Sequence, residues 1–509
     1  MAWEVRSPQS WPPRTQGSGK GRWRLGSPRG SDGWIWGPLG GGDHGGRSDG
    51  QRGRHETPPQ RAGDARAMTS AAPKDAQAAA QDFLDSFLGE FPGPPSPEAP
   101  LPWKAPGAPV SQEEAEGELI ELALSLLCGR NAPLPLACSL TREAVTRLMQ
   151  EADLSAFRQA PREERGVQEE EGEEDDGISV ALLDAKSLQR CFFRGLWEVC
   201  SQWQKQMPAP STCASRPWMT SIHAIRNTRR KMEDRHVSLP AFNELFGLCD
   251  QVDRAYFAVF DGHGGVDAAN YAAIHVHVNI ARHLEVTRNP AEALRAGFKK
   301  TDEMFLQKAR REKLQSGTTG VCVLLVGRTV HVAWLGDSQV MLVQQGQALE
   351  LMKPHKPERP DERERIEALG GFVSYMDCWR VNGTLAVSRA IGDVFQKPYV
   401  SGEADVASHE LSGTEDYLLL ACDGFFDSVS REEVAGLVHG LLLGSEGSGL
   451  RLAEELVAAA RQRGSRDNIT VLVVFLRDPR ELLRDGPPGA AGAQQDPSVA
   501  GSASACFGS

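Results

Sequence analysis

Apolar residues recur at helical spacing between about residues 77 and 205. Around Phe87 they return every three or four positions, which places them on one face of a helix. The same spacing predicts four helices, over Phe83–Phe91, Leu119–Leu127, Val145–Met149 and Leu188–Trp203. Such stripes either form a core, packed on each other or on the next domain, or dock a partner. The pattern alone leaves both interpretations open.

The pattern changes after residue 215, where short apolar runs rich in β-branched residues predict strands. These runs are Ala255–Phe260, Gly320–Val326, Thr329–Leu335, Val340–Val343, Tyr417–Ala421 and Ile469–Phe475. Helix starts are predicted at Asn289-Pro290 and at the capping box Ser430-x-x-Glu433, and Asn382-Gly383 predicts a tight turn. Because strands come in runs and helices in separate pairs, the pattern favours the α+β class.

Composition divides the chain into four predicted parts. Residues 1–67 are rich in Gly, Arg and Trp without periodicity, with eleven Lys or Arg against six Asp or Glu, and they predict a disordered basic extension. Residues 68–214 form a helical regulatory region with an acidic linker at 163–176. Residues 215–477 form the globular domain, and 478–509 a disordered tail.

Charge and cysteine content exclude several classes of protein. The formal charge of 56 − 68 = −12 argues against a general binder of nucleic acid or anionic membranes. No apolar run reaches the roughly 18 residues of a membrane span. The ten cysteines include no C-x-x-C pair, which indicates reduced thiols in a cytoplasmic, or also nuclear, protein.

Four aspartates of the globular domain adjoin predicted strands or glycines. Asp261 and Asp423 directly follow apolar runs and precede Gly, Asp337 follows Gly336, and Asp467 comes just before the last strand. Each motif alone is a common turn. Four carboxylates at one end of a sheet would repel each other unless cations lay between them.

Oxygen ligands favour Mg²⁺ or Mn²⁺ over Zn²⁺. Two such ions about 4 Å apart would supply a bridging hydroxide that hydrolyses a phosphate ester. The basic stretch at Arg229, next to Glu233 and Asp234, offers a guanidinium for phosphate oxygens, although a charged surface loop would look the same. A two-metal nuclease is the alternative chemistry, but it would need a basic, aromatic groove.

These motifs together resemble the metal-dependent protein phosphatases of the 2C type. The resemblance covers about residues 220–476 and rests on Arg229-x-x-Met232-Glu233-Asp234, Phe260–Gly265, Ser316–Thr319, Gly336–Ser338, Gly370-Gly371, Leu385–Asp393, Ala421–Gly424 and Asp467–Thr470. It implies a β-sandwich of two antiparallel sheets flanked by helix pairs, with metals in a cleft at one end.

The resemblance also implies the role of each site residue. Asp261 would bridge two Mg²⁺ or Mn²⁺ ions, with the Gly262 carbonyl and Glu233 on one ion and Asp423 and Asp467 on the other. Arg229 would hold the phosphate, His263 would protonate the leaving Ser or Thr oxygen, and Asp337 with Asp423 would hold a weaker third ion. Asp234 and Asn468 would orient these ligands. A catalytically dead, phosphoprotein-binding member of the family is disfavoured because the metal-binding aspartates are intact.

The flanking segments resemble one branch of the family, the calcium/calmodulin-dependent protein kinase phosphatases. The segments are Leu101–Gly107, Glu116–Leu119, the acidic run and Leu196–Glu198. By that resemblance the substrates would be phosphorylated protein kinases, and exchange factors of the PIX type would bind the N-terminal region. Two other patterns carry no site: His275 and His277 are expected to be core histidines, and Cys322–Arg328 has cysteine-phosphatase spacing but a strand-like interior.

Overall fold

The structure is a computed structural model that describes residues 73–484 apart from 97, 99, 104–107, 160–180, 210–215 and 217. All described residues belong to one compact unit within Gly63–Ser509. The extension 1–67 and the acidic linker 163–176 lie outside the described residues. The domain boundaries at 67 and 214 stay predictions.

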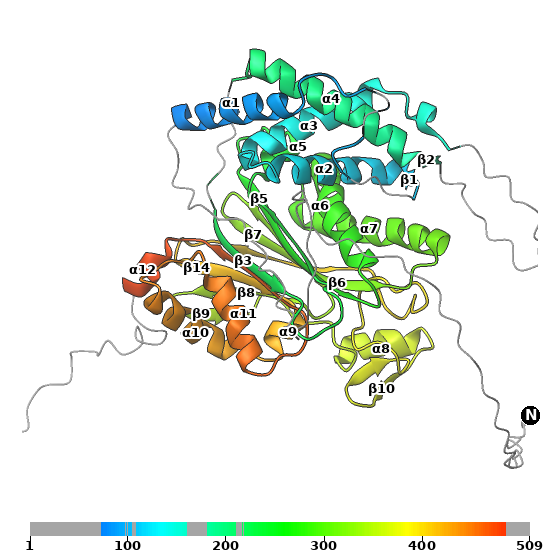
Figure 1. Ribbon diagram of the computed structural model, residues 1–509. Helices are drawn as coiled ribbons and strands as arrows, with labels where there is room; N and C mark the ends of the chain where they lie inside the picture. The colour runs from blue at the N-terminus through cyan, green and yellow to red at the C-terminus, as the bar shows by residue number, and fades with distance from the viewer. Residues whose placement is uncertain are drawn as a thin grey trace, which may run out of the picture. The chain divides into compact units, whose positions relative to one another are not determined.

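Two antiparallel sheets lie face to face at the centre of this unit (Figure 1). The first has the order β13-β7-β6-β5-β4, with β12 against β6: β4 (Arg235–Leu239), β5 (Arg254–His263), β6 (Gly317–Val326), β7 (Thr329–Leu335), β12 (Ile391–Gly392) and β13 (Asp405–Glu410). The second has the order β3-β15-β14-β8-β9: β3 (Met219–Ile225), β8 (Gln339–Gln344), β9 (Gln347–Leu349), β14 (Glu415–Ala421) and β15 (Ile469–Phe475). The predicted β-sandwich is confirmed.

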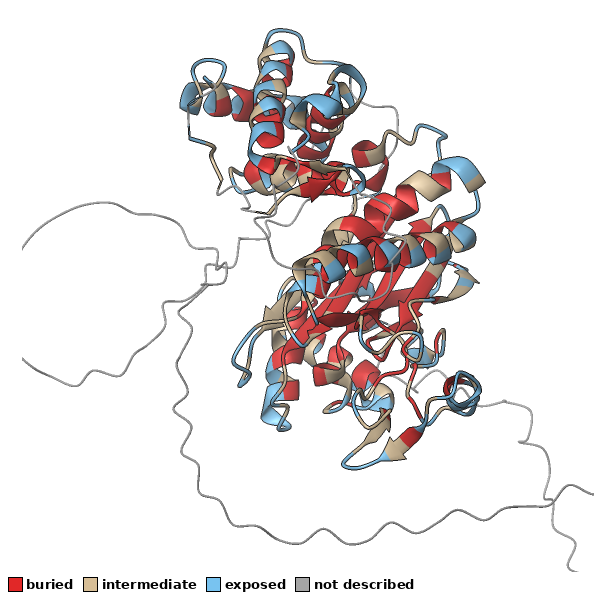
Figure 2. Cartoon of the chain, turned by 90° about the vertical axis from the view of Figure 1, so that its right-hand side faces the viewer, coloured by how far each residue is buried: buried red, intermediate tan, exposed pale blue. Residues whose placement is uncertain are grey.

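Strand periodicity buries both faces of each sheet. In β5, Phe257 and Val259 belong to the apolar cluster between the sheets, whereas Tyr256 and Phe260 face the helices outside. In β14, Leu418 and Leu420 face inward and Leu419 faces the other helical layer. This two-sided burial explains why the strands read as continuous apolar runs (Figure 2).

Helix pairs cover the two outer faces of the sandwich. The pair α6 (Asp267–Thr287) and α7 (Pro290–Glu312) packs on the first sheet, and α10 (Arg431–Gly444) with α11 (Leu452–Gln462) packs on the second, beside the short α9 (Asp423–Phe426). Asn289 caps α7 by accepting from the backbone of Ala291 and Glu292, and the Ser430–Glu433 capping box is formed. Both predicted helix starts are therefore confirmed.

The N-terminal helices join the core of the first helical layer. They are α1 (Pro73–Glu90), α2 (Gln112–Cys128), α3 (Leu134–Glu151) and α4 (Ala185–Lys205), accompanied by η1 (Leu154–Phe157), α5 (Phe242–Phe246) and the short pair β1 (Val110–Ser111) and β2 (Leu182–Leu183). Their apolar stripes lie in one continuous cluster with α6, α7 and the outer face of the first sheet. Of the two interpretations of these stripes, the structure therefore favours a core.

Helix α2 contacts α6 closely. The Tyr271 hydroxyl donates to Glu114 Oε1 at 3.1 Å, and a Cβ at Gly117 would lie 2.4 Å from His275 Nδ1. His275 and His277 are buried in this layer, as predicted, and burial lowers the pKa of His277 to about 3. The glycine at 117 is what lets the two helices approach this closely.

Two further segments complete the described fold. Helix α8 (Pro360–Ala368) and the hairpin β10 (Val373–Tyr375)–β11 (Trp379–Val381) lie between β9 and β12 in the chain, and Asn382-Gly383 forms the tight turn that follows. The expectation that order ends at Arg477 is wrong, because Pro479–Arg484 forms α12, whose Leu482 is buried against the second helical layer. Among the described residues, no helix has the length and hydropathy of a membrane span.

Candidate metal-binding active site

The ends of the central strands bring the predicted carboxylates to one end of the sandwich. Asp261 lies near the end of β5, opposite Thr319 of β6, and shares the strand face of Phe257 and Val259, which points between the sheets. Its backbone carbonyl accepts a hydrogen bond from Thr318 Oγ1 at 2.9 Å. Asp423 follows β14 in the opposite sheet, so the two aspartates meet where the two sheets end.

The carboxylates are close enough to repel one another strongly. One ligand atom from each of Asp234, Asp261 and Cys422 lies within 4.8 Å of the others. Burial is the largest cause that raises the pKa of Asp261, and the charges of Asp234 and Asp423 raise it further. The pKa of Asp261 therefore lies well above its ordinary range. Burial and neighbouring carboxylates also raise the pKa of Asp423 to about 7 and that of Asp234 to about 6. The cluster is therefore poised to bind protons or cations.

A loop beside the cluster carries the candidate phosphate-binding arginine. Asn468 holds this loop by donating to the carbonyls of Arg226 and Lys231, at 2.9 and 3.1 Å, and by accepting from the Glu233 amide at 2.7 Å. The Arg229 guanidinium forms an ion pair with Asp467 and is mostly exposed. Arg229 thus lies at the rim of the cluster, where an incoming phosphate would meet it.

Asp337 has a cationic partner. The Lys356 ammonium lies 2.5 Å from Asp337 Oδ2, and although burial opposes it, the Asp337 carboxylate raises the pKa of Lys356. His355 forms two hydrogen bonds with Gly336, the residue before Asp337. The His355 amide donates to the Gly336 carbonyl, and His355 Nδ1 accepts from the Gly336 amide. The segment Pro354–Pro357 therefore fixes Asp337 and the glycine before it.

His263 ends β5 and has its own carboxylate partner. Its Nε2 lies 2.7 Å from Asp393 Oδ2, on the loop after β12. Burial lowers the affinity of the imidazole for a proton, but Asp393, with Asp337 and Glu233, outweighs burial and raises the pKa of His263. This imidazole therefore has a carboxylate hydrogen-bonded to Nε2 and lies next to the acidic cluster.

Comparisons with known proteins agree with this geometry. The family described as "Protein phosphatase 2C" matches residues 218–469. The chain is 65% identical over 434 residues to "Protein phosphatase 1F" of Rattus norvegicus, an alignment that covers 84% of this chain and 95% of that protein. The chain belongs to the protein phosphatase 2C family. It is a metal-dependent hydrolase that removes phosphate from serine and threonine residues of proteins.

Other relatives extend the comparison beyond the phosphatase domain. The chain is 52% identical over 388 residues to "Protein phosphatase 1E" of Homo sapiens, covering 76% of this chain but 49% of that longer protein. A solved structure titled "Structure of a C.elegans sex determining protein" has a TM-score of 0.60 at 22% identity and covers 81% of this chain and 97% of that chain. Because 81% exceeds the half matched by the family, this fold likeness reaches into the N-terminal helices.

The phosphatase brings together the residues that its sequence singled out. Asp261, Asp423, Asp337 and Asp467 influence one another electrostatically, and Glu233 acts on His263. The Gly262 backbone lies against the Glu233 carbonyl. A Cβ at position 262 would lie 2.6 Å from the Glu233 carbonyl oxygen. Their individual roles stay predictions.

Sequence reasoning missed three members of this site. Asp393 and Lys356 come from loops 130 and 19 residues away from their partners, His263 and Asp337. Cys422, next to Asp423, lies among the carboxylates instead of simply ending a strand. Asp393 belongs to the family motif Leu385–Asp393, and membership of that motif is the only feature of the sequence that points to it.

The donor set of the phosphatase fits a divalent cation. Asp234 Oδ1 is buried without a hydrogen-bond partner, although Oδ2 accepts from Thr470 Oγ1 at 2.7 Å. An uncompensated buried carboxylate oxygen is costly, and a cation in the cluster would remove that cost. Carboxylate oxygens at this density suit Mg²⁺ or Mn²⁺.

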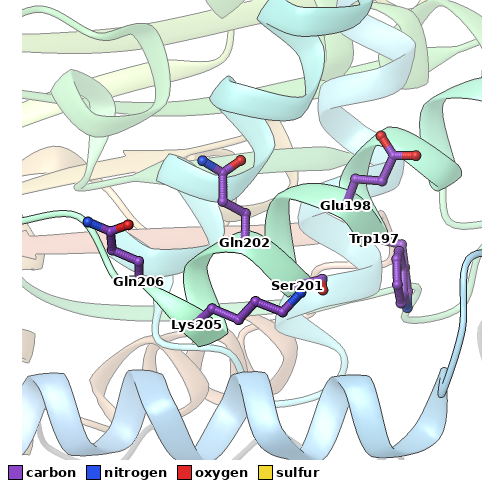
Figure 3. Close-up of a pocket in the computed structure, with 6 residues that line it drawn as sticks. All are labelled: Trp197, Glu198, Ser201, Gln202, Lys205 and Gln206. Atoms are coloured by element: carbon purple, nitrogen blue, oxygen red, sulfur yellow. The ribbon is translucent and has the colours of Figure 1, made fainter.

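A surface groove on α4 lies apart from this cluster. It is lined by Trp197, Glu198, Ser201, Gln202 and Lys205 of this helix and by Gln206 just after its end (Figure 3). The Trp197 indole donates to the Phe91 carbonyl at 2.8 Å, so that ring is held in place. The groove holds a single carboxylate, and it does not have the chemistry of a hydrolytic site.

Proposed function

We propose that this phosphatase hydrolyses phosphoserine and phosphothreonine with two Mg²⁺ or Mn²⁺ ions, and that its substrates are phosphorylated protein kinases. The carboxylate cluster around Asp261 carries the metal part of the proposal, because it leaves buried negative charge for cations to neutralise. The kinase substrates are proposed from the resemblance of the flanking segments alone.

The proposed roles are those that the family resemblance implies. Asp261, Glu233 and the Gly262 carbonyl would hold one ion, and Asp261, Asp423 and Asp467 would hold the other. The bound ions would lower the pKa of the attacking water and offset the charge of the phosphate. Asp337 with Asp423 would hold a third ion more weakly, because the Lys356 ammonium already pairs with the Asp337 carboxylate.

Arg229 and His263 would act on the substrate directly. Arg229 would exchange its ion pair with Asp467 for the phosphate oxygens, which accept its paired N–H donors. His263 would donate a proton to the serine or threonine oxygen as the P–O bond breaks, because an alkoxide is a poor leaving group. The proton comes from the imidazole, and the phosphorus–oxygen bond electrons stay with the leaving oxygen.

An assay on a phosphothreonine peptide tests the metal requirement and the role of Arg229. We expect turnover with Mn²⁺ and none with excess EDTA. Arg229→Ala should raise KM for the peptide by about tenfold or more, since a charged hydrogen bond to phosphate is worth roughly 1.5–3 kcal/mol. Arg230→Ala, which replaces an exposed neighbour, is the control and should leave KM unchanged. Hydrolysis that survives EDTA would show the metal proposal to be wrong.

The N-terminal region is proposed to bind exchange factors of the PIX type, again by resemblance. Deleting the region would expose the apolar outer faces of α6 and α7, so point changes on the surface are the cleaner test. We expect Lys205→Glu, which reverses a charge on the α4 groove, to weaken binding of a purified PIX-type factor in calorimetry. The exposed Lys186→Glu at the start of the same helix is the control. If the wild-type protein, Lys205→Glu and Lys186→Glu bound the factor equally, the α4 groove would not be its binding site.

A further inference from the structure

We propose that Asp393 is a positioning residue that orients His263 for proton donation to the leaving group. This inference rests on the proposed role of His263 as the general acid. Asp393 and His263 are 130 residues apart in the chain, yet Oδ2 of one lies 2.7 Å from Nε2 of the other. Engaging Nε2 in this way leaves Nδ1 as the ring nitrogen available to a substrate.

The loop that carries Asp393 is held firmly enough to orient a ring. The Asp393 amide donates to the Ser316 carbonyl at 3.2 Å, and the Asp393 carbonyl accepts from the Gln396 amide at 2.8 Å. The backbone at Asp393 has φ 51°, in the left-handed region, which aspartate adopts more readily than most other side chains. These two backbone hydrogen bonds fix the main chain from which the Asp393 carboxylate reaches His263.

A buried ion pair fixes the same loop to helix α7. Asp302 accepts from the Gly392 amide and from Lys397 Nζ, both at 2.8 Å, and Lys397 also donates to the Ala390 carbonyl at 2.9 Å. Both members of this pair are largely buried. The backbone on either side of Asp393 is therefore anchored independently of His263.

Gly317 of strand β6 leaves room for the Asp393–His263 pair because it has no side chain. A Cβ at Gly317 would lie 2.1 Å from Asp393 Oδ2 and 2.4 Å from His263 Nε2. Any side chain at 317 would push the carboxylate and the imidazole apart. Gly317→Ala therefore disturbs the pair without altering either member.

Two substrates separate a positioning role from a structural one. Expulsion of p-nitrophenolate needs little help from an acid, whereas a threonine alkoxide needs protonation. With the full chain and Mn²⁺, Asp393→Asn is expected to lower kcat on a phosphothreonine peptide by at least about tenfold. We expect KM for the peptide, and turnover of p-nitrophenyl phosphate, to stay near the wild-type values. Gly317→Ala should show the same selectivity if Asp393→Asn fails to fold.

A double variant tests whether Asp393 acts through His263. His263→Gln with Asp393→Asn should be no slower on the peptide than His263→Gln alone, because residues that act as a unit are not additive. The control is Asp377→Asn, which removes an exposed partner of Arg380 on the β10–β11 hairpin and should match wild type on both substrates.

The outcomes distinguish this inference from the proposed function. If His263→Gln loses activity selectively on the peptide but Asp393→Asn slows both substrates equally, or the double variant is additive, Asp393 has only a structural role. If His263→Gln slows both substrates equally, the general-acid role itself is wrong, and the positioning role of Asp393 falls with it. The metal requirement, measured separately with EDTA, is unaffected by either result.

Discussion

Asp261→Asn is expected to abolish phosphatase activity and, in EDTA, to make the protein more stable than wild type. Asp261 would bridge both ions, so its loss should lower kcat by well over the roughly 10–100-fold cost of losing an outer-shell partner. In the metal-free protein the same carboxylate is crowded by Asp234 and Asp423. A neutral side chain of equal size removes that repulsion, and each kcal/mol gained would raise the melting temperature by about 2–4 °C.

Asp416→Asn is the matched control for this prediction. Asp416 is also buried, but it accepts from the Gly346 amide at 2.7 Å and pairs with Arg477 at 2.5 Å, away from the cluster. Its substitution should lower the melting temperature in EDTA and leave kcat unchanged, since it breaks a satisfied buried pair. If Asp261→Asn also lowered the melting temperature in EDTA, the carboxylates would not be under mutual strain.

Strands buried on both faces could be predicted from the sequence, and edge strands could not. The runs within β5, β6, β7, β14 and β15 are apolar at nearly every position because helices cover one face and the opposite sheet covers the other. Edge strands β3 and β13 include polar residues, as in Asp405–Glu410, and have partly exposed faces. Their strand conformation depends on pairing with β15 and β7, which no local pattern reports.

Some residues of the site could likewise be predicted from the local sequence, and others could not. Asp261 and Asp423 could be found because each follows an apolar strand and precedes a glycine, a local signal with a physical cause. Asp393 and Lys356 have no such signal, because their importance comes from folding that brings distant loops to His263 and Asp337. The capping box at Ser111 and Glu114 is a local signal that the sequence analysis missed, and Glu114 also accepts from Tyr271 of α6.

The stability of the metal-free phosphatase should fall as pH rises from about 5 to 7. Burial, together with neighbouring carboxylates, raises the pKa of Asp423 to about 7 and that of Asp234 to about 6, whereas both groups would lose their protons near 3.8 in the unfolded chain. Between those values the native state binds more protons than the unfolded state, so the free energy of unfolding decreases with rising pH. Above about pH 7 the dependence on these two groups should level off.

Saturating Mn²⁺ should remove or reverse this trend, because carboxylates must release their protons to bind a cation. Melting temperatures measured from pH 5 to 8, with EDTA and with Mn²⁺, test the expectation directly. Asp423→Asn should flatten the EDTA profile, whereas Asp416→Asn should shift it downward without changing its slope. Parallel profiles in EDTA and Mn²⁺ would mean that the titrating groups do not bind the metal. Opposite slopes would tie the raised pKa values to the cation site, since protons and Mn²⁺ would then compete for the same buried oxygens.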